Sequence, residues 1–444
     1  MKVIHLATTN AGGAGIAAVR IHNLLKEMGH ESHLYVQNKQ QDTPDTTELK
    51  NKGGQGKKYM VSMRFFRKFA KLMAKHNPAI ADSTDWRRFR KDDVYCYNDW
   101  DEENKDGFFP GLENKIDLEN VDIIFVHQII GYLNTYDIKR LYEKSRCGNG
   151  HARVIFTMMD MAPVTGGCHY AWDCRGFTDT CFNCPALPFE LNTRSHFQLE
   201  AKAQNILYMN AEIMSNAIYD LDFAVSSAIP FSRYWQYFYP VDEEIFAPMN
   251  LPEEEGVKYL FSIANFANDV RKGFTYVLQT LLYLDPRIPD GQKIKFLCLA
   301  PELFADYKFE KIEFEKFGFC RNVNDLAKVY NKADVFLCTS VEDSAPMMLE
   351  EALLCGIPTV SFDVGTARQF IRDGKNGYVA ERFNAIDFAE RTYRLLYKTP
   401  ETLEQPSEIH EGMVKILGKA VIKNQFEAVL SCSEKSQYKK IGEK

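Results

Sequence analysis

One stretch in the second half of the chain, residues 339–363, most constrains what the sequence can fold into. Two short runs of strand-forming residues, Asp334 to Thr339 and Thr359 to Phe362, flank a segment with the length and composition of a short helix. Strand, helix and strand in this order indicate a βαβ unit of a parallel sheet. The stretch therefore predicts an α/β fold.

The N-terminus of this short helix has the features of an anion-binding site. Ser344 is expected to cap the helix, and Pro346 suits its first turn, where a missing N–H costs nothing. The N–H groups of Met347 and Met348 then face an open loop, and helix N-termini of this kind bind phosphate. The sequence thus predicts a phosphate site here.

Two carboxylates surround the same helix N-terminus. Asp343 precedes the helix, and Glu351 lies within it, eight positions later. Such a pair suits a ligand with hydroxyls and phosphates, for example a sugar nucleotide. The spacing, followed by Cys355-Gly-Ile-Pro, resembles the carboxylate motif of retaining glycosyltransferases of family 4. For this stretch alone, an ordinary βαβ unit with a capped helix is a serious alternative, so the rest of the chain must decide.

Composition excludes several classes of protein. The 444 residues suffice for two domains, and 45% hydrophobic with 26% charged residues describe a soluble globular chain. A net charge of −6 gives no support for nucleic-acid binding. We expect neither a signal peptide nor a membrane-spanning helix, which needs about 18 apolar residues. A cytoplasmic protein with reduced cysteines is therefore expected.

The first residues open a doubly wound α/β domain. Lys2 to Ala7 reads as a buried strand, residues 8–15 as a glycine-rich turn, and Ile16 to Met28 as an amphipathic helix. Glycines at such a turn let a phosphate or sugar approach the backbone. The turn, with Gly12 and Gly13, resembles the Gly-Gly-Ala-Gly turn of the same family, which lies beside the transferred sugar and the acceptor. Phe223 to Ser226 reads as the last strand of this domain.

A histidine follows a further buried strand. His127 comes directly after Val121 to Val126, and the carboxyl ends of parallel strands face ligands in open α/β sheets. It is placed like the family's sugar-positioning histidine, although a histidine that merely ends a strand is the alternative. Many relatives have a second histidine before Asp160, where this sequence has Met159.

The segment 57–76 has the pattern of a basic, aromatic-rich helix. Such a helix can lie on an anionic membrane surface, and in the resembled family this region helps to reach lipid-linked acceptors. A domain helix with its aromatic side packed and its lysines solvated is an equal alternative.

Four cysteines lie close together in residues 168–184. Cys168, Cys174, Cys181 and Cys184 could converge on one tetrahedral metal, and the Cys181-Phe-Asn-Cys184 pair is the usual chelating half of such a site. A subset of the resembled family carries this insert. We favour a structural zinc; an iron–sulfur centre, two disulfides or free thiols are the alternatives.

Two cations lie at a strand-to-helix turn in the second half of the chain. Arg271 and Lys272 precede Gly273 and could neutralise a diphosphate, the arginine as a fork and the lysine as a point charge. The resembled family has Arg-Lys-Gly or Glu-Lys-Gly at this turn, with a further basic residue upstream that this sequence lacks.

The resemblance covers most of the chain and implies an α/β protein of GT-B architecture, with two Rossmann-like domains facing a central cleft. We expect an acceptor-binding domain at 1–250, containing the Cys-rich insert at 168–184. A nucleotide-sugar domain follows at 251–410, and a helical tail at 411–444 is expected to return in part to the first domain.

The implied reaction is transfer of a hexose, with retention, from a nucleotide diphosphate sugar to a hydroxyl of a lipid-linked glycan in polysaccharide biosynthesis. The implied catalytic residues are His127, Asp343, Lys272 and Arg271. No catalytic metal is expected, and the location is the cytoplasm, with peripheral contact at the inner membrane face. The donor-binding residues would be Gly12, Gly13, Arg271, Lys272, Asp343, Ala345, Met347, Met348 and Glu351. The alternatives are a non-catalytic sugar-nucleotide-binding or assembly partner, or another GT-B enzyme such as a phosphorylase.

Overall fold

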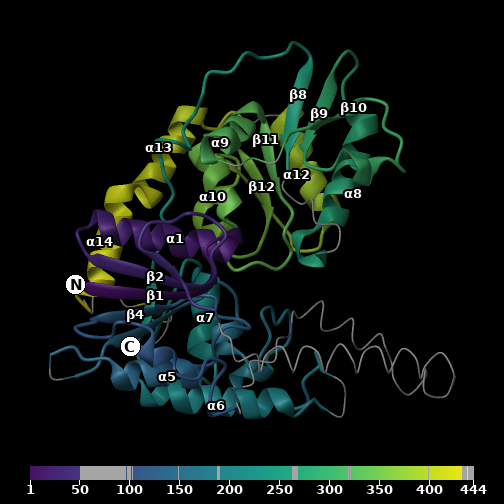
Figure 1. The fold of residues 1–444 in the computed structure, drawn as a ribbon. Helices are drawn as coiled ribbons and strands as arrows, with labels where there is room; N and C mark the ends of the chain where they lie inside the picture. Colours follow the sequence, from purple (N-terminus) through teal and green to yellow (C-terminus); the bar gives the residue numbers. More distant parts are fainter. Residues whose placement is uncertain are drawn as a thin grey trace, which may run out of the picture. The chain divides into compact units, whose positions relative to one another are not determined.

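The computed structural model describes residues 1–50, 97, 102, 104–148, 150–187, 191–262, 269–318, 320, 322–398, 400–432 and 438. The chain divides into two compact units, each described here by itself (Figure 1). Unit 1 comprises Met1–Ser215, Asp220–Gln236 and, near the C-terminus, Tyr438. Unit 2 comprises Asn216–Tyr219 and Tyr237–Cys432. The basic segment 57–76, expected at a membrane surface, lies outside the described residues.

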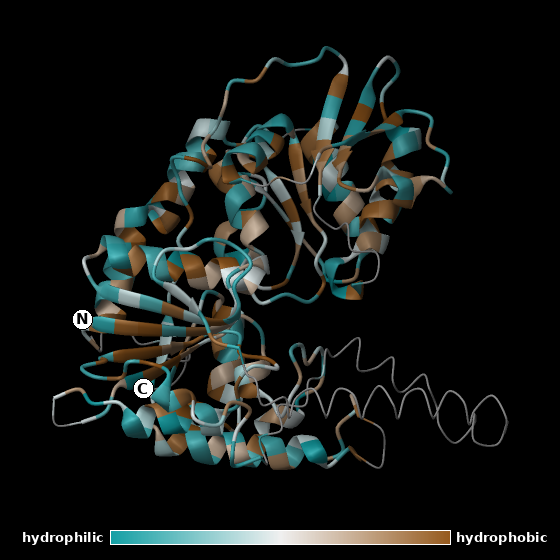
Figure 2. Cartoon of the chain, viewed as in Figure 1, coloured by the Kyte–Doolittle hydropathy of each residue, from teal (hydrophilic) through white to brown (hydrophobic). Residues whose placement is uncertain are grey.

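Unit 1 is built on a seven-stranded sheet in which every strand pair is parallel, in the order β3-β2-β1-β4-β5-β6-β7. The central strands are apolar on both sides, as expected for a sheet covered by helices on two faces, and they appear largely brown in Figure 2. The strands are β1 (Lys2–Thr9), β2 (Glu31–Asn38), β3 (Thr46–Glu48), β4 (Ile123–Val126), β5 (Arg153–Thr157), β6 (Glu212–Ser215) and β7 (Tyr234–Gln236).

Helices cover both faces of this sheet, with α1 on one face and α5 and α6 together on the other (Figure 1). They are α1 (Gly12–Glu27), α5 (Thr135–Lys144), α6 (Arg194–Tyr208) and α7 (Ile218–Ser226). Helix α1 begins at Gly12, four residues earlier than the sequence predicted. Gly15 accounts for the close approach of α1 to β1, because a Cβ there would lie 2.7 Å from the carbonyl oxygen of Thr9.

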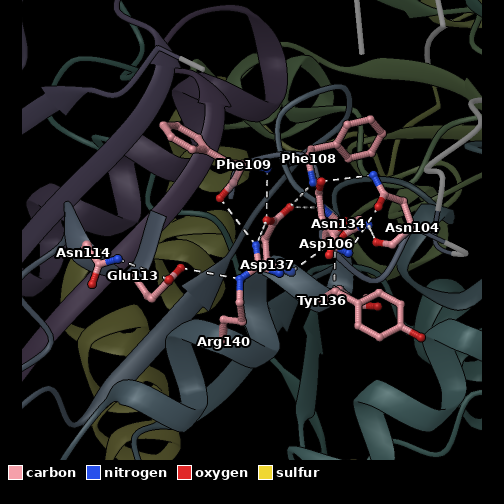
Figure 3. Close-up of polar contacts among 12 residues, drawn as sticks. Asn104, Asp106, Phe108, Phe109, Glu113, Asn114, Asn134, Tyr136, Asp137 and Arg140 are labelled. Carbon is pink, nitrogen blue, oxygen red and sulfur yellow. Dashed lines mark hydrogen bonds and ion pairs between the residues drawn. The ribbon is translucent and has the colours of Figure 1, made fainter. Parts of the chain in front are cut away.

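Asp137 fastens an irregular segment to the N-terminus of α5 (Figure 3). Its carboxylate accepts hydrogen bonds from the backbone N–H groups of Phe108 (2.8 Å), Phe109 (3.1 Å) and Asn134 (3.0 Å). Burial nevertheless raises the pKa of Asp137. Gly107 must be glycine, because it has φ +72° and a Cβ would lie 2.2 Å from a carboxylate oxygen of Asp137.

Unit 2 contains a six-stranded parallel sheet in the order β10-β9-β8-β11-β12-β13. Helices α8 and α12 pack together on one face, and α9 and α10 lie on the other (Figure 1). The strands are β8 (Val257–Phe261), β9 (Lys293–Cys298), β10 (Ile312–Lys316), β11 (Val335–Cys338), β12 (Thr359–Phe362) and β13 (Gly377–Ala380). The helices are α8 (Phe274–Leu284), α9 (Val323–Lys332), α10 (Met347–Leu354), α11 (Ala367–Phe370), α12 (Ala385–Tyr397), α13 (Pro406–Leu417) and α14 (Lys419–Leu430). The predicted α/β class with two Rossmann-like units is confirmed.

The units divide earlier than the sequence suggested, at Gln236 rather than residue 250. The intervening segment packs within unit 2, since Tyr237 contacts Phe426 edge to face and the N–H of Met249 donates to Asn331 (2.6 Å). Of the tail, α13 and α14 belong to unit 2. Tyr438 belongs to unit 1, where its N–H donates to the carbonyl of Tyr234 (2.8 Å).

One strand prediction was wrong. Residues 223–226 lie in α7, and the last strands of unit 1 are β6 and β7. Strand β6 was missed because it begins with a buried acid, Glu212, which pairs with Arg153 (2.7 Å) and accepts a bond from the Trp235 indole (2.6 Å). In the described part of the chain, no helix is both long and apolar enough to cross a membrane.

Candidate functional site

In unit 2, two of the predicted site residues form an ion pair. Lys272 lies in the turn between β8 and α8, Asp343 in the loop between β11 and α10, and Lys272 Nζ is 2.5 Å from Asp343 Oδ2. The Asp343 side chain is 11% exposed. Burial opposes ionisation of this carboxyl, but the Lys272 ammonium outweighs that effect and lowers the pKa of Asp343. A positive and a negative group thus lie side by side at the carboxyl ends of neighbouring strands.

A glycine brings the two loops into contact. Gly273 has φ +71°, and a Cβ at this position would lie 1.9 Å from the carbonyl oxygen of Thr339. The Thr339 hydroxyl donates to the carbonyl of Lys272 (3.0 Å), and the N–H of Val341 donates to the carbonyl of Arg271 (2.8 Å). The β8–α8 turn is therefore tied to the β11–α10 loop through backbone atoms.

Arg271 faces the same loop. Its guanidinium pairs with Asp269 (2.7 Å), and a second nitrogen donates to the carbonyl of Glu342 (3.4 Å). The side chain of Asp269 also accepts from the N–H of Arg271 (3.1 Å) and so caps the short turn. The two predicted cations are thus both held against residues 341–343, one by a side chain and one by a backbone oxygen.

The N-terminus of α10 differs from the predicted cap. The helix begins at Met347 with Pro346 as its N-cap residue, and no side chain caps it. The Ser344 hydroxyl is buried and has no hydrogen-bond partner among the described residues, so the expectation of a serine cap was wrong. Ala345 and Met348 are half-buried at this helix start.

A second glycine packs against the backbone of the loop before α10. Gly365 follows β12 and has φ +56°, and a Cβ there would lie 2.7 Å from the carbonyl oxygen of Ser344 and 3.0 Å from that of Asp343. No larger residue fits without moving the loop that carries Asp343. Both sides of this loop are thus defined by contacts that only glycine permits.

Glu351 lies on the buried side of α10. It is 5% exposed, and its Oε2 accepts a hydrogen bond from the Tyr330 hydroxyl (3.1 Å). Burial, together with the neighbouring Glu351 carboxylate, raises the pKa of Tyr330 well above its usual value. The adjacent Glu350 is fully buried and accepts from the side-chain amide of Asn216 (2.7 Å). The two glutamates therefore have different partners.

In unit 1, His127 is committed to bonds within the protein. The imidazole is 2% exposed, with Nδ1 2.8 Å from the Thr157 hydroxyl and Nε2 2.9 Å from Nδ1 of His5. It also lines a cavity of about 10 Å³ with residues that include Gln128 and Asp160. The histidine thus lies at the predicted strand end, but both ring nitrogens already have partners.

A functional candidate that the sequence analysis missed is His169. Its Nδ1 lies 2.6 Å from Oδ2 of Asp160, and burial that opposes ionisation of Asp160 is outweighed by His169, which lowers the pKa of the carboxyl. Its Nε2 is buried without a hydrogen-bond partner among the described residues. His169 thus supplies Asp160 with an imidazole partner where Met159 provides none. The only signal in the sequence was its place in the Cys-rich insert.

The predicted sugar-side glycines lie in open surroundings. A Cβ at Gly12 or Gly13 would meet no atom within 4 Å, although Gly12 has φ +69°. Packing therefore does not require a glycine at either position, and only the backbone conformation does so at Gly12.

The four cysteines of the insert line one cavity of about 70 Å³ in unit 1. Cys168 and Cys184 are buried, and a hydrogen bond from Cys168 lowers the pKa of Cys184 to about 7. Within the described ranges, however, no group of three or more potential ligands is placed to hold a metal ion. The structural zinc expected from the spacing is therefore not supported, because the thiols surround the cavity without forming a ligand set.

Comparison with known proteins adds the family. Residues 257–398 match the family described as "Glycosyl transferases group 1". The match lies within the second unit, which is thus similar to this family. The matched residues contain the Lys272–Asp343 pair, the start of α10 and Glu351. The predicted family is confirmed.

Two curated relatives of this chain show how far the sequence similarity extends. N-acetyl-alpha-D-glucosaminyl L-malate synthase of Bacillus anthracis is 22% identical over 45% of this chain and 51% of its own length. The putative colanic acid biosynthesis glycosyl transferase WcaC of Escherichia coli K12 is 25% identical over 58% of this chain and 64% of its own length. The chain thus spans about half to two thirds of these relatives.

Solved structures show the likeness of fold. Anabaena Alr3699/HepE, in complex with UDP, superposes with a TM-score of 0.60 at 12% identity and covers 97% of this chain and 100% of its own. At this identity the likeness shows the GT-B fold alone. The expected GT-B architecture, with its two Rossmann-like units, is confirmed.

Proposed function

We propose that this group 1 glycosyltransferase transfers a hexose from a nucleotide diphosphate sugar to a hydroxyl of a glycan acceptor, with retention at the anomeric carbon. The observation that carries the proposal is the Lys272–Asp343 pair beside the start of α10. Two neighbouring loops there present a cation for a diphosphate and a carboxylate for sugar hydroxyls. Such neighbours suit a nucleotide diphosphate sugar, because this one molecule carries both a diphosphate and sugar hydroxyls.

The barrier in such a reaction is heterolysis of the bond between sugar and phosphate. Preorganised donors and cations that stabilise the departing diphosphate are the largest available contribution. We assign this role to Lys272, Arg271 and the N–H groups of Met347 and Met348. Asp343 would hold hydroxyls of the transferred sugar, and the departing phosphate would accept the proton of the acceptor hydroxyl. On this route no divalent metal takes part.

Glu351 is proposed to accept hydrogen bonds from the ribose hydroxyls of the donor, with the Tyr330 hydroxyl holding its other oxygen in place. In unit 1, Gly12, Gly13 and His127 are proposed to lie beside the transferred sugar and the acceptor. The acceptor is proposed to be a lipid-linked glycan of a polysaccharide pathway. The Escherichia coli relative is named as a putative glycosyl transferase of colanic acid biosynthesis, which supports a biosynthetic role.

Replacing Glu351 with alanine is expected to raise the KM for the donor about 10- to 100-fold, because a hydrogen bond to a charged group contributes about 1.5–3 kcal/mol. The change is measured from initial rates of nucleotide diphosphate release. Tyr330→Phe is the matched control, since it removes the bond to Glu351 without removing the carboxylate. An equal rise in KM in both variants would show that Glu351 acts through packing rather than on the donor.

A donor screen decides between this function and its rivals. Thermal shifts with UDP-, GDP- and ADP-sugars identify the base, because a ligand bound only to the folded state raises its stability. UDP-glucose is the first to test, since Anabaena HepE was solved with it. A chain that binds a donor but never releases its sugar would favour a binding protein. Turnover that requires inorganic phosphate would favour a phosphorylase.

A further inference from the structure

A chain of buried side chains crosses the sheet of unit 1 at His127. It links Thr157 at the end of β5, His127 after β4, His5 on β1, Ser32 on β2 and His22 on α1. Consecutive members are 2.8, 2.9, 3.0 and 2.8 Å apart, and each is at most 5% exposed. His22 Nε2 ends the chain on the carbonyl oxygen of Pro44, at 3.0 Å.

The parallel register explains why the chain is continuous. Leu6 pairs with Val126, and Val126 pairs with Phe156, so that residues at the ends of β4 and β5 lie beside one another and beside β1. The rings of His5 and His127 are nearly parallel, at 4°, with centroids 5.2 Å apart. With the two nitrogens only 2.9 Å apart, the rings meet edge to edge rather than face to face.

We infer that this chain fixes one neutral tautomer at each of its three histidines, which makes His5, Ser32 and His22 positioning residues for His127. The direction of every hydrogen bond follows from the carbonyl of Pro44, because a carbonyl oxygen can only accept. His22 must therefore carry its proton on Nε2, and its Nδ1 must accept the Ser32 O–H.

The remaining protons follow in turn. Ser32 has already donated its hydrogen, so it accepts from Nε2–H of His5, and Nδ1 of His5 is left as an acceptor. His127 must then donate from Nε2, and its Nδ1 accepts the Thr157 O–H. The competing acceptor for that hydroxyl, the carbonyl of Val126, is farther away at 3.4 Å. Every donor in the chain is used once, with all three rings neutral.

The opposite direction would require an additional proton. If Thr157 donated its hydroxyl proton to the carbonyl of Val126, every hydrogen bond between Thr157 and His22 would reverse its direction. His22 would then have to donate from Nδ1 to Ser32 and from Nε2 to the carbonyl of Pro44. His22 would then be an imidazolium within a buried network. Apart from His5 and His127, the groups that act electrostatically on His22 are Lys26, Asp45 and His33, and the first two form an ion pair with each other. Burial is the main reason that the pKa of His22 is lowered, which disfavours this reversed state.

The tautomers can be observed directly in the full-length protein labelled with 15N-histidine, because ring nitrogens with and without a proton differ in two-bond 1H–15N correlation spectra. At neutral pH we expect Nε2–H patterns for His5, His22 and His127. An Nδ1–H or imidazolium pattern at His127 would overturn the inference.

Ser32→Ala tests the link between the distant residues and His127. It is expected to give His127 a mixture of tautomers. The control Thr47→Val removes a hydroxyl that pairs with His33, which is not part of this hydrogen-bonded series, and should leave the His127 signals unchanged. Ser32→Thr, which keeps a hydroxyl, should restore the single tautomer and separates the effect from misfolding. A Ser32→Ala spectrum identical to wild type at His127 would contradict the inference.

The effect on activity rests on the proposed function. Ser32→Ala should lower kcat about tenfold with a smaller change in KM, comparable with the low end of the loss when the partner of a metal-ligating histidine is removed. Thr47→Val should leave kcat unchanged. A wild-type kcat retained in Ser32→Ala would limit the hydrogen-bonded series to a structural role. A wild-type protein without turnover would refute the proposed function, while the spectra would still decide the tautomers.

Discussion

Replacing Lys272 with alanine is expected to lower the rate of sugar transfer about 10²–10³-fold, the usual cost of removing one preorganised group that stabilises charge in a transition state. Lys272 is the closest cation to Asp343, at 2.5 Å, and Gly273 ties its backbone to the β11–α10 loop. The loss should therefore appear in kcat and in kcat/KM together. The assay is nucleotide diphosphate release from a donor that the wild-type chain accepts.

Two controls separate this effect from a loss of structure. Lys258→Ala removes a lysine that pairs with Asp334 (2.9 Å) in the same unit, and it should leave turnover unchanged. Lys272→Ala leaves the carboxylate of Asp343 buried without its cation, which costs about 3–5 kcal/mol in comparable pairs. The double variant Lys272→Ala, Asp343→Asn removes that charge, and it should fold normally yet stay inactive. Wild-type turnover in Lys272→Ala would refute the assignment.

Acidification should destabilise unit 1 through its buried histidines. Burial lowers the pKa of His5 and His22, and it lowers the pKa of His127 from 6.5 to about 3. Between pH 6.5 and these lowered values the unfolded chain binds protons that the folded chain does not. The free energy of unfolding therefore rises with pH across this window, by about 1.4 kcal/mol per pH unit for each such histidine.

Urea titrations between pH 5 and 6.5 measure this slope. All four tryptophans precede residue 237, so their fluorescence reports mainly on unit 1. His127→Gln should reduce the slope by about one proton. Val36→Ala, a cavity-forming change at a fully buried position on β2, should lower stability with the slope unchanged. A slope that is the same in His127→Gln and wild type would refute the prediction.

The sequence predicted the parts of the fold in which apolar runs are bounded by glycines at turns. The opening β1–α1–β2 unit and the β11–α10–β12 unit were anticipated because apolar runs and turn glycines bound them. Strand β6 was not, since it begins with the charged Glu212, whose burial depends on Arg153 and Trp235. These two residues are distant in sequence and lie on β5 and β7, the strands that flank β6 in the sheet. Local pattern carries no information on such long-range pairing.

The candidate site shows the same division. The neighbourhood of Lys272 and Asp343 followed from two motifs at the ends of adjacent strands. The partners of His127 did not follow, because His5 and Ser32 each look like single polar residues in strands, and only the register places them together. The misplaced serine cap has a similar cause, since Gly365 shapes the loop before α10 from outside the motif.

The path of the chain between the units has a mechanical consequence. The exposed segment 251–256 lies inside unit 2, so a single protease cut there would leave residues 237–250 on the N-terminal fragment. Those residues stay packed against the other fragment, as the bond between Met249 and Asn331 illustrates. Tyr438, on the C-terminal fragment, remains bonded to Tyr234 on the N-terminal one. In a nicked molecule, the N-terminal fragment would thus contribute residues 237–250 to unit 2, and the C-terminal fragment would contribute Tyr438 to unit 1. The two fragments would separate only in denaturant.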